Sequence, residues 1–423
     1  MKIYDSVHGF IRFNEIESAL IDSPAFQRLH YIRQLGMGYL VYPGATHTRF
    51  EHSLGVMELA SRIFERIFFK LFDKQKNEGE YWKQILRLSA LCHDLGHLPF
   101  SHTAEKALFS KGKHEEWTLK IICSKQLDII WQEMQKKFPQ KDVVNDLIKM
   151  SIGENTLVSL KLKERKLAFS PIEKVLAQVI AGDFFGADRI DYLLRDAKCT
   201  GVSYGLFDYH QLIEMLTVIP SSASSLKKLS LGIEEGGIES CEALLLARHF
   251  MHKRVYQHAA VKAYSFHLSR FMKTLLSKKE SFWTLEGYLA TSDNEILAEL
   301  SSASTNSSHP GHQDAICILQ RTKRFKALPI RSNVKEKELL KLITQLSIPK
   351  NEIGWELTIS KKSKRGLDFS VQKKSGAIVE AALCSEICIP NDSTSWVFLA
   401  PSYVSAFQKG FDDLYSSYAN ECC

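Results

Sequence analysis

The sequence predicts a mainly α-helical protein in which a large helical core is followed by a small C-terminal α+β domain. Apolar residues recur at helical spacing through most of the first 280 residues. After a Ser-rich segment, the pattern changes to short apolar runs that alternate with two further helical stretches. The length of 423 residues and the 45% hydrophobic content leave room for a large buried core.

Helical periodicity defines most elements of the core. We expect helices at 56–72, 82–92, 103–110, 117–123, 171–181, 187–199 and, in one long stretch, 238–276. Ser170 and Pro171 form a typical helix start, and Gly201 forms a typical stop. Gly201 also begins a GxSxG match, but a helix precedes it where a nucleophile elbow requires a strand, so we do not expect a serine hydrolase. A hairpin is expected at 215–219 and 229–234.

A Ser-rich linker at 301–314 is expected to separate the core, residues 1–300, from a C-terminal domain, residues 315–423. In that domain the patterns predict strands at 315–319, 355–359, 369–372 and 396–399 and helices at 336–346 and 403–418. From residue 315 onward, 16 lysines and arginines face 11 acidic residues. This basic excess would suit an anionic partner, including nucleic acid.

Composition restricts the cellular setting. No run of about 18 uncharged apolar residues occurs, so no membrane span is expected. The N-terminus lacks the layout of a signal peptide. Nine cysteines without a CxxC pair are typical of free thiols in a reducing compartment. We therefore expect a cytoplasmic protein.

Histidine is distributed unevenly along the chain. Of 15 histidines, 13 fall at or before residue 267, and eight of these lie between residues 8 and 114. His93 and Asp94 directly follow an apolar helix, where unpaired ionisable groups would be costly to bury. Because Gly96 lets the chain turn there, both side chains can converge on one ion. We therefore expect His93 and Asp94 to bind a metal.

Two ligands are too few for a metal site, and two other helices supply candidates. His52 precedes an apolar helix, and Asp188 lies at the head of a third. Asp191, on the same helical face, competes with Asp188, and spacing leaves the choice open. Histidine and carboxylate ligands suit Mn, Fe, Zn, Co or Ni, with Mg less natural. Such a metal would lower the pKa of a water molecule and orient it as a nucleophile.

Further histidines and arginines surround these candidates. His97, His102 and His114 follow closely, and Arg49 and Arg189 adjoin candidate ligands. Arginine forms forked contacts with phosphate, and histidine donates protons to leaving oxygens. The residues alone therefore predict metal-assisted hydrolysis of a phosphate ester or anhydride.

Five motifs carry a resemblance to a known family. They are DSVHG at 5–9, FQRL at 26–29, QLG at 34–36, RFEHSLGV at 49–56 and HDLGHLPFSH at 93–102. With Asp188, this set resembles the deoxynucleoside triphosphate (dNTP) triphosphohydrolases of the HD superfamily of metal phosphohydrolases. The resemblance extends from residue 2 to about residue 273 and is weak or absent beyond.

The resemblance implies a role for each candidate residue. It places the metal on His52, His93, Asp94 and Asp188, and the catalytic groups at His97, His114 and Asp94. It places phosphate binding on Arg49, His102, Arg189, Tyr192 and Arg248, and nucleoside binding on Gln34, Leu35, Asp196, His252, Tyr256 and Gln257. Leu35 packed against Tyr256 would crowd a 2′-hydroxyl and favour deoxynucleotides.

The sequence also departs from the family pattern. Arg189 stands where the human member has a lysine, which keeps the charge but alters the geometry. In a candidate allosteric set, Asp22 and Gln27 are present, but His30 replaces an arginine and Gln211 a second basic residue. Because two cations are lost there, we expect activation by a nucleotide to be weakened.

We therefore expect a metal-dependent enzyme, with its catalytic segments at 34–257, that converts a dNTP to a deoxynucleoside and inorganic triphosphate. The family implies a homo-oligomer, and no membrane partner is expected. Two alternatives stay open: an HD phosphohydrolase acting on another nucleotide, such as a monophosphate or an alarmone, and a non-catalytic nucleic-acid or regulatory binding protein on the same fold.

Overall fold

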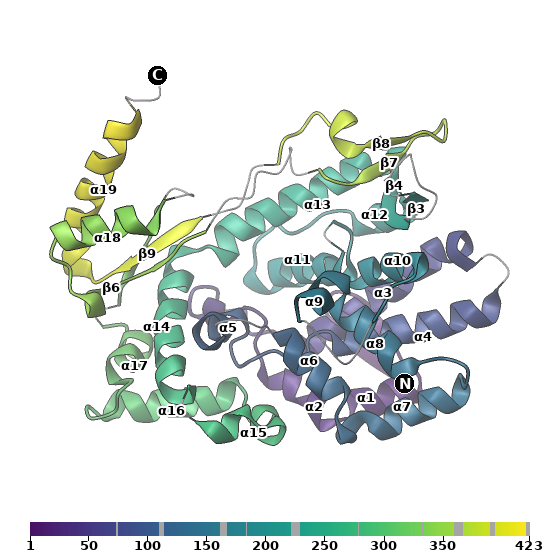
Figure 1. Ribbon diagram of the computed structural model, residues 1–423, viewed down its shortest axis with the longest axis horizontal. Helices are drawn as coiled ribbons and strands as arrows, with labels where there is room; N and C mark the ends of the chain where they lie inside the picture. The colour runs from purple at the N-terminus through teal and green to yellow at the C-terminus, as the bar shows by residue number, and fades with distance from the viewer. Residues whose placement is uncertain are drawn as a thin grey trace.

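Helices make up most of the molecule, which confirms the predicted mainly α-helical fold, and small sheets supplement them (Figure 1). The computed structural model describes residues 1–423 except 73–74, 110–113, 161–166, 183, 221–228, 278, 323, 331–333, 359–366, 390–393 and 420–423, with backbone only at 106 and 414–419. Among the described helices, none has both the length and the apolar character needed to cross a bilayer.

Three helices form the centre of the core. They are α3 (Arg49–Phe72), α4 (Lys76–Cys92) and α11 (Ala187–Thr200). Helix α3 packs against both of the others, and its buried apolar residues, such as Val56 and Ile63, follow the helical repeat. Both α3 and α4 begin before the predicted positions, because their first turns are more polar than the buried faces on which the prediction rested.

Capping residues determine where several helices of the core begin and end. The other helices up to residue 276 are α1 (Glu15–Ile21), α2 (Pro24–Gln27), α5 (His102–Leu108), α6 (His114–Ile122), α7 (Lys125–Lys137), α8 (Val143–Ile152), α9 (Glu154–Ser159), α10 (Pro171–Ala181), α12 (Tyr209–Glu214), α13 (Ile238–Met251) and α14 (Ala259–Leu276). The predicted start of α10 is confirmed, since Ser170 and Glu173 form a capping box. Helix α11 ends at Gly201 in the left-handed conformation, so the GxSxG match follows a helix.

The predicted single helix at 238–276 is wrong, because a turn of π-helix at His252–Tyr256 separates α13 from α14. The backbone N–H of Gln257 closes this turn on the carbonyl of His252 at 2.8 Å. A single π-turn often marks a functional position, since it shifts the side chains that follow it around the helix axis.

The strands form three small sheets within the described residues. Strands β1 (Lys2–Asp5) and β2 (Gly9–Arg12) make an N-terminal hairpin. The predicted hairpin of β3 (Leu216–Pro220) and β4 (Leu229–Glu234) is confirmed. Strand β4 also pairs in parallel with β7 (Ser370–Gln372), which pairs with β8 (Ile378–Glu380). This four-stranded sheet crosses the predicted boundary between core and C-terminal domain, and the division stays a prediction.

The rest of the C-terminal part is an α+β unit beside α14 (Figure 1). Its sheet has the order β5 (Lys326–Ile330), β9 (Ser395–Leu399), β6 (Ile353–Glu356). Helices α18 (Glu336–Gln345) and α19 (Val404–Ala419) complete the unit and share an apolar core with the sheet. The predicted strand at 355–359 is shorter than expected, since β6 ends at residue 356; residue 359 lies outside the described residues.

Two predictions around residue 310 are wrong. The segment 301–314, expected to be a linker, is helical at both ends: α16 (Asp293–Thr305), which follows α15 (Leu285–Leu289), includes its first residues, and α17 (His312–Leu319) includes its last. The run at 315–319 is therefore helix, not strand. Leu300 and Ala303 of α16 and Ile318 of α17 join one apolar cluster with α14. This packing stabilises helix in a stretch whose composition favours a loop.

Candidate active site

Four of the predicted metal ligands converge from three helices. His52 lies on α3, His93 and Asp94 follow the end of α4, and Asp188 lies in the first turn of α11. The Nε2 atom of His52 is 3.0 Å from Asp188 Oδ1 and 3.6 Å from Asp94 Oδ2. The Nε2 atom of His93 is 3.4 Å from Asp94 Oδ1 and 3.8 Å from Asp188 Oδ1. The structure thus brings the whole predicted set to one point.

The orientation of His93 tests whether this group fits a metal. Its Nδ1–H donates to the carbonyl of Ala90 at 2.7 Å, so Nε2 is the ring nitrogen turned toward Asp94 and Asp188. Nε2 is buried and has no hydrogen-bond partner among the described residues. A buried ring nitrogen without a hydrogen-bond partner, beside two carboxylates, is costly unless a cation binds between them. The donor set therefore fits a divalent ion.

The electrostatics of the cluster also favour a cation. Burial alone would raise the pKa of Asp94, but Arg49, with His93 and His97, holds it well below its usual value. Burial lowers the pKa of His52, yet the carboxylates of Asp188 and Asp191 raise it to about 10. Both shifts have the direction expected where ionised carboxylates attract positive charge.

Asp191, which competes with Asp188 in the sequence, lies behind His52. One oxygen accepts a hydrogen bond from His52 Nδ1 at 2.8 Å, and the other accepts from His8 Nε2 at 2.7 Å. Arg195 donates to both oxygens at 2.9 Å. Asp191 is fully buried, whereas 36% of the Asp188 side chain is exposed beside the Nε2 atom of His52. The geometry thus favours Asp188 as the ligand and Asp191 as its support.

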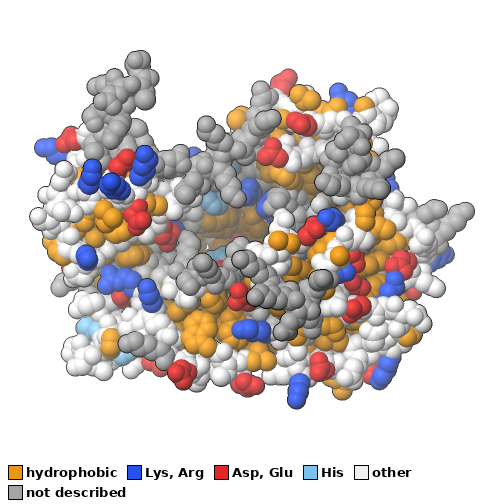
Figure 2. All heavy atoms as spheres, in the orientation of Figure 1, with side chains coloured by type: hydrophobic (Ala, Val, Ile, Leu, Met, Phe, Trp, Pro, Cys, Tyr) orange, Lys and Arg blue, Asp and Glu red, His pale blue; other side chains and the backbone are white. Residues whose placement is uncertain are grey.

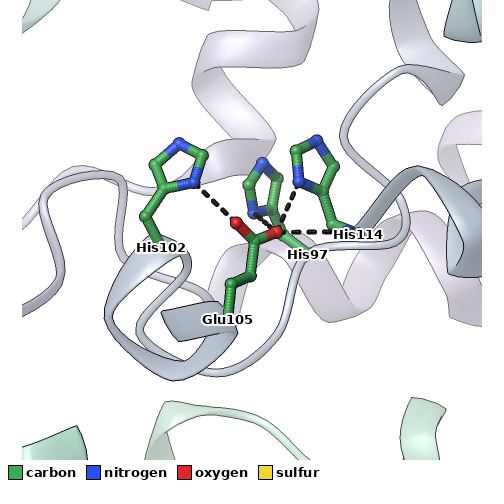
Figure 3. A group of neighbouring side chains, drawn as sticks. All are labelled: His97, His102, Glu105 and His114. Atoms are coloured by element: carbon green, nitrogen blue, oxygen red, sulfur yellow. Dashed lines mark hydrogen bonds and ion pairs between the residues drawn. The ribbon is translucent and has the colours of Figure 1, made fainter. Parts of the chain in front are cut away.

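A second group adjoins the first (Figure 3). His97 and His114 stack with ring centroids 3.7 Å apart. Glu105 joins them: one oxygen is 2.5 Å from His114 Nδ1 and 3.9 Å from His97 Nδ1, and the other is 2.8 Å from His102 Nδ1. His97 connects the two groups, since its Nε2 is 3.2 Å from Asp94 Oδ1. Sequence reasoning missed Glu105, although its i+3 spacing from His102 on α5 was a usable signal.

The two stacked histidines differ in protonation. Burial and the neighbouring Arg49 hold the pKa of His97 well below its usual value, so this ring is neutral. Burial lowers the pKa of His114 as well, but the bond to Glu105 outweighs it and raises the pKa. The pKa of Glu105 is lowered, because its bonds to His102 and His114 outweigh its burial. The surroundings therefore favour the protonated form of His114 and the neutral form of His97, which stacks on it.

The predicted phosphate-binding residues differ in availability. Arg189 and Tyr192 follow Asp188 on α11, and the buried Nε and Nη1 of Arg189 have no hydrogen-bond partner among the described residues. Burial raises the pKa of Tyr192, although Arg189 and Arg248 act against it. Arg49 is instead engaged, since it donates to Ser101 Oγ at 2.8 Å and pairs with Asp94. Arg49 therefore holds the Asp94 carboxylate in this structure.

The predicted nucleoside-binding residues lie around Asp196. Its carboxylate accepts hydrogen bonds at 2.7 Å from both His47 Nε2 and the Tyr256 hydroxyl. The Tyr256 ring lies 6.1 Å from that of Tyr192 and 6.2 Å from that of His252. His47 was not predicted.

Three further members of the predicted nucleoside set lie on separate segments. Leu35 packs on the core, and the side-chain oxygen of Gln34 is buried without a partner among the described residues. Gln257 accepts a bond from Trp396 Nε1 of β9 at 2.7 Å, which ties it to the C-terminal unit.

Among the described residues, the candidate allosteric residues form hydrogen bonds and ring contacts with other side chains and backbone groups, and none with one another. Gln27 donates to the carbonyl of Ile21 at 2.8 Å. His30 is exposed and stacks on Phe50 with ring centroids 3.5 Å apart. Asp22 accepts a hydrogen bond from Ser18 at 3.2 Å.

The surface of the molecule is hollowed. Figure 2 shows a hollow in the middle of the displayed face, with hydrophobic and histidine side chains in its depth.

The chain is similar in sequence to known proteins. The HD domain model matches residues 49–166, and the HD associated region model matches 207–328. An uncharacterized protein of Methanocaldococcus jannaschii is 37% identical over 260 residues, 62% of this chain and 46% of that protein. The deoxynucleoside triphosphate triphosphohydrolase SAMHD1 of Bos taurus is 33% identical over 273 residues, 60% of this chain and 44% of that protein.

A solved structure matches more of this chain than these two relatives do. The chain spans about half the length of the curated relatives it matches. A hypothetical protein from Aquifex aeolicus, known from its crystal structure, matches with a TM-score of 0.74 and 30% identity over 97% of this chain and 99% of that one. With the HD domain, the HD associated region and the histidine and aspartate cluster all in place, the chain belongs to the HD-domain phosphohydrolase family.

Proposed function

We propose that this protein is a divalent-metal-dependent enzyme that hydrolyses dNTPs to a deoxynucleoside and inorganic triphosphate. The observation that carries the proposal is the convergence of His52, His93, Asp94 and Asp188, with the unpartnered Nε2 of His93 aimed at the carboxylates. A divalent ion held there, whether Mn, Fe, Zn, Co, Ni or Mg, would polarise a phosphoryl oxygen and lower the pKa of a water molecule.

The neighbouring histidines supply proton transfer. Hydrolysis at the α-phosphorus joins a water oxygen to phosphorus and breaks the bond to O5′, which must gain a proton. His114 is protonated and held by Glu105, so it is placed to give that proton. His97, neutral and stacked on His114, adjoins the charge that develops at the phosphate. This pair therefore accounts for acid assistance to the leaving group.

The remaining residues bind the substrate. Arg189, Tyr192, Arg248 and His102 would hold the triphosphate, and the partner-free N–H groups of Arg189 are suited to forked phosphate contacts. The Asp196–Tyr256 pair, with Leu35, Gln34, His252 and Gln257, would hold the nucleoside. The similarity to SAMHD1, named as a deoxynucleoside triphosphate triphosphohydrolase, supports a dNTP as substrate.

Product analysis tests the proposal. The purified protein is incubated with each dNTP and with Mn²⁺ or Mg²⁺, with and without GTP, and the products are separated by ion exchange. We expect deoxynucleoside and triphosphate in equal amounts, and none from His93→Ala protein. Release of pyrophosphate or single phosphate would refute the reaction. His93→Ala/Asp94→Ala protein that keeps its full metal content would refute the metal site.

The same experiment separates the alternatives. Hydrolysis confined to a monophosphate or an alarmone would indicate another HD phosphohydrolase. Absence of hydrolysis, together with a salt-dependent shift of single-stranded nucleic acid, would indicate a binding protein. A homo-oligomeric state and a cytoplasmic location stay predictions, and size-exclusion chromatography with light scattering tests the first.

A further inference from the structure

We infer that the N-terminal hairpin is part of the candidate metal centre and that His8, at its turn, is a positioning residue for the ligand His52. The inference rests on the metal site of the proposed function. It assigns a role to a segment that precedes the HD domain match at residue 49 and shares no helix with any predicted ligand.

A continuous chain of hydrogen bonds connects the hairpin to the ligand. His8 Nε2 donates to Asp191 Oδ1 at 2.7 Å, and His52 Nδ1 donates to Asp191 Oδ2 at 2.8 Å. The side chains of His8 and Asp191 are fully buried, and that of His52 is 1% exposed. Solvent therefore cannot replace either bond.

This chain determines how His52 faces the metal. An imidazole that donates through Nδ1 presents Nε2 on the opposite side of the ring, and here Nε2 faces Asp188 and Asp94. The Asp191 carboxylate holds the ring in this orientation only if the carboxylate itself cannot rotate. Removal of a partner that orients a metal ligand in this way typically weakens metal affinity about 10–100-fold.

The hairpin restrains Asp191 at two points. His8 holds Oδ1 directly. Arg195 donates to both oxygens of Asp191 and is itself held by Asp5, at 2.7 and 3.2 Å. Asp5 Oδ1 also accepts the backbone N–H of Val7 at 2.9 Å and of His8 at 2.8 Å, so the turn is folded around the same carboxylate.

The packing of α3 shows that this arrangement is tight. Gly55, one helical turn after His52, faces Asp191 and Arg195, and a Cβ atom there would overlap with the Asp191 carboxylate. Only glycine lets the buried ion network approach the helix that carries the ligand. Because the network is packed so closely, we expect the loss of His8 to shift Asp191 and, with it, His52.

Metal binding by His8 variants tests the inference. His8→Leu removes the donor, whereas His8→Gln keeps an N–H at similar reach; His210→Gln, on an exposed histidine of α12, is the matched control. Affinity for Co²⁺ is measured by equilibrium dialysis with mass-spectrometric metal counting, and the visible spectrum of bound Co²⁺ reports on its ligands. We expect His8→Leu to bind Co²⁺ about 10–100-fold more weakly with an altered spectrum, His8→Gln to recover most of the affinity, and the control to match the wild type.

Each outcome decides between two claims. If His8→Leu binds Co²⁺ as tightly as the wild type with the same spectrum, the inference is wrong while the proposed function stands. If the wild type itself binds no Co²⁺, the proposed metal site fails. Should His8→Leu not fold by circular dichroism, His8→Asn, whose amide is too short to reach Asp191, replaces it with the same expected loss.

Discussion

Buried His47 makes the stability of this protein depend on pH in a predictable direction. Its Nε2 donates to Asp196 at 2.7 Å, and both side chains are 2% exposed. Burial lowers the pKa of His47, but the Asp196 carboxylate outweighs it and raises the pKa from 6.5 to about 9. The folded protein therefore holds this proton more tightly than the unfolded chain does.

The size and the sign of the effect follow from the shift. A difference of about 2.5 pKa units corresponds to about 3 kcal/mol, at 1.36 kcal/mol per unit. Because the folded pKa lies above the unfolded one, this stabilisation is complete below pH 6.5. It is lost as the pH rises through 9, where the folded imidazolium gives up its proton.

Urea unfolding of the wild type and of His47→Gln at pH 6 and pH 9.5 measures the effect. The glutamine amide still donates to Asp196 but does not titrate, so every other ionisable group contributes equally to both proteins. We expect the free energy of unfolding of the wild type, relative to the variant, to fall by about 3 kcal/mol between the two pH values. A relative stability that stays constant within about 1 kcal/mol would refute the assignment of a charged His47.

Three further substitutions probe the site. Asp188→Asn is expected to weaken metal binding at least about tenfold yet change the free energy of urea unfolding by less than about 1 kcal/mol, because the side chain is 36% exposed. Glu105→Gln should lower kcat about 10²–10⁴-fold at unchanged metal content, since His114 loses the carboxylate that keeps it protonated; an unchanged kcat would contradict the acid role. Gly55→Ala should cost about 1–3 kcal/mol of stability and reduce metal retention through its overlap with Asp191, and full metal content would contradict this.

Local sequence signals predicted the elements whose ends are set by neighbouring residues. Helix α10 begins at Pro171 because the Ser170 cap is encoded beside it, and α11 ends at Gly201 for a similar local reason. The run at 315–319 is different, because four or five apolar residues suit a strand or a helix equally. Its packing against α14 and α16, which no local pattern reveals, decides for helix.

In the candidate site, too, some residues could be predicted from their neighbours in the sequence and others could not. His52, His93 and Asp94 were predictable, since ionisable residues beside apolar helices need a reason to be buried. The choice between Asp188 and Asp191 could not be made from spacing, because both lie on one helical face. It depends on His8, which is 183 residues from Asp191 along the chain and contacts it only in the folded protein.

The roles of these histidines follow from what the second ring nitrogen contacts. In His93 a backbone carbonyl accepts the hydrogen bond of Nδ1, in His52 the buried Asp191 accepts it, and in both rings Nε2 is the nitrogen that faces the carboxylates. In His114 Glu105 takes the bond, keeps the ring protonated and leaves Nε2 pointing away (Figure 3). The same side chain is therefore suited to metal binding where Nε2 faces carboxylates, and to proton donation where a carboxylate holds Nδ1 and Nε2 points away from it. Asp191 and Glu105 come from other helices than His52 and His114, which they contact. Histidine spacing therefore predicts where the site lies, but only the fold indicates which role each histidine is suited to.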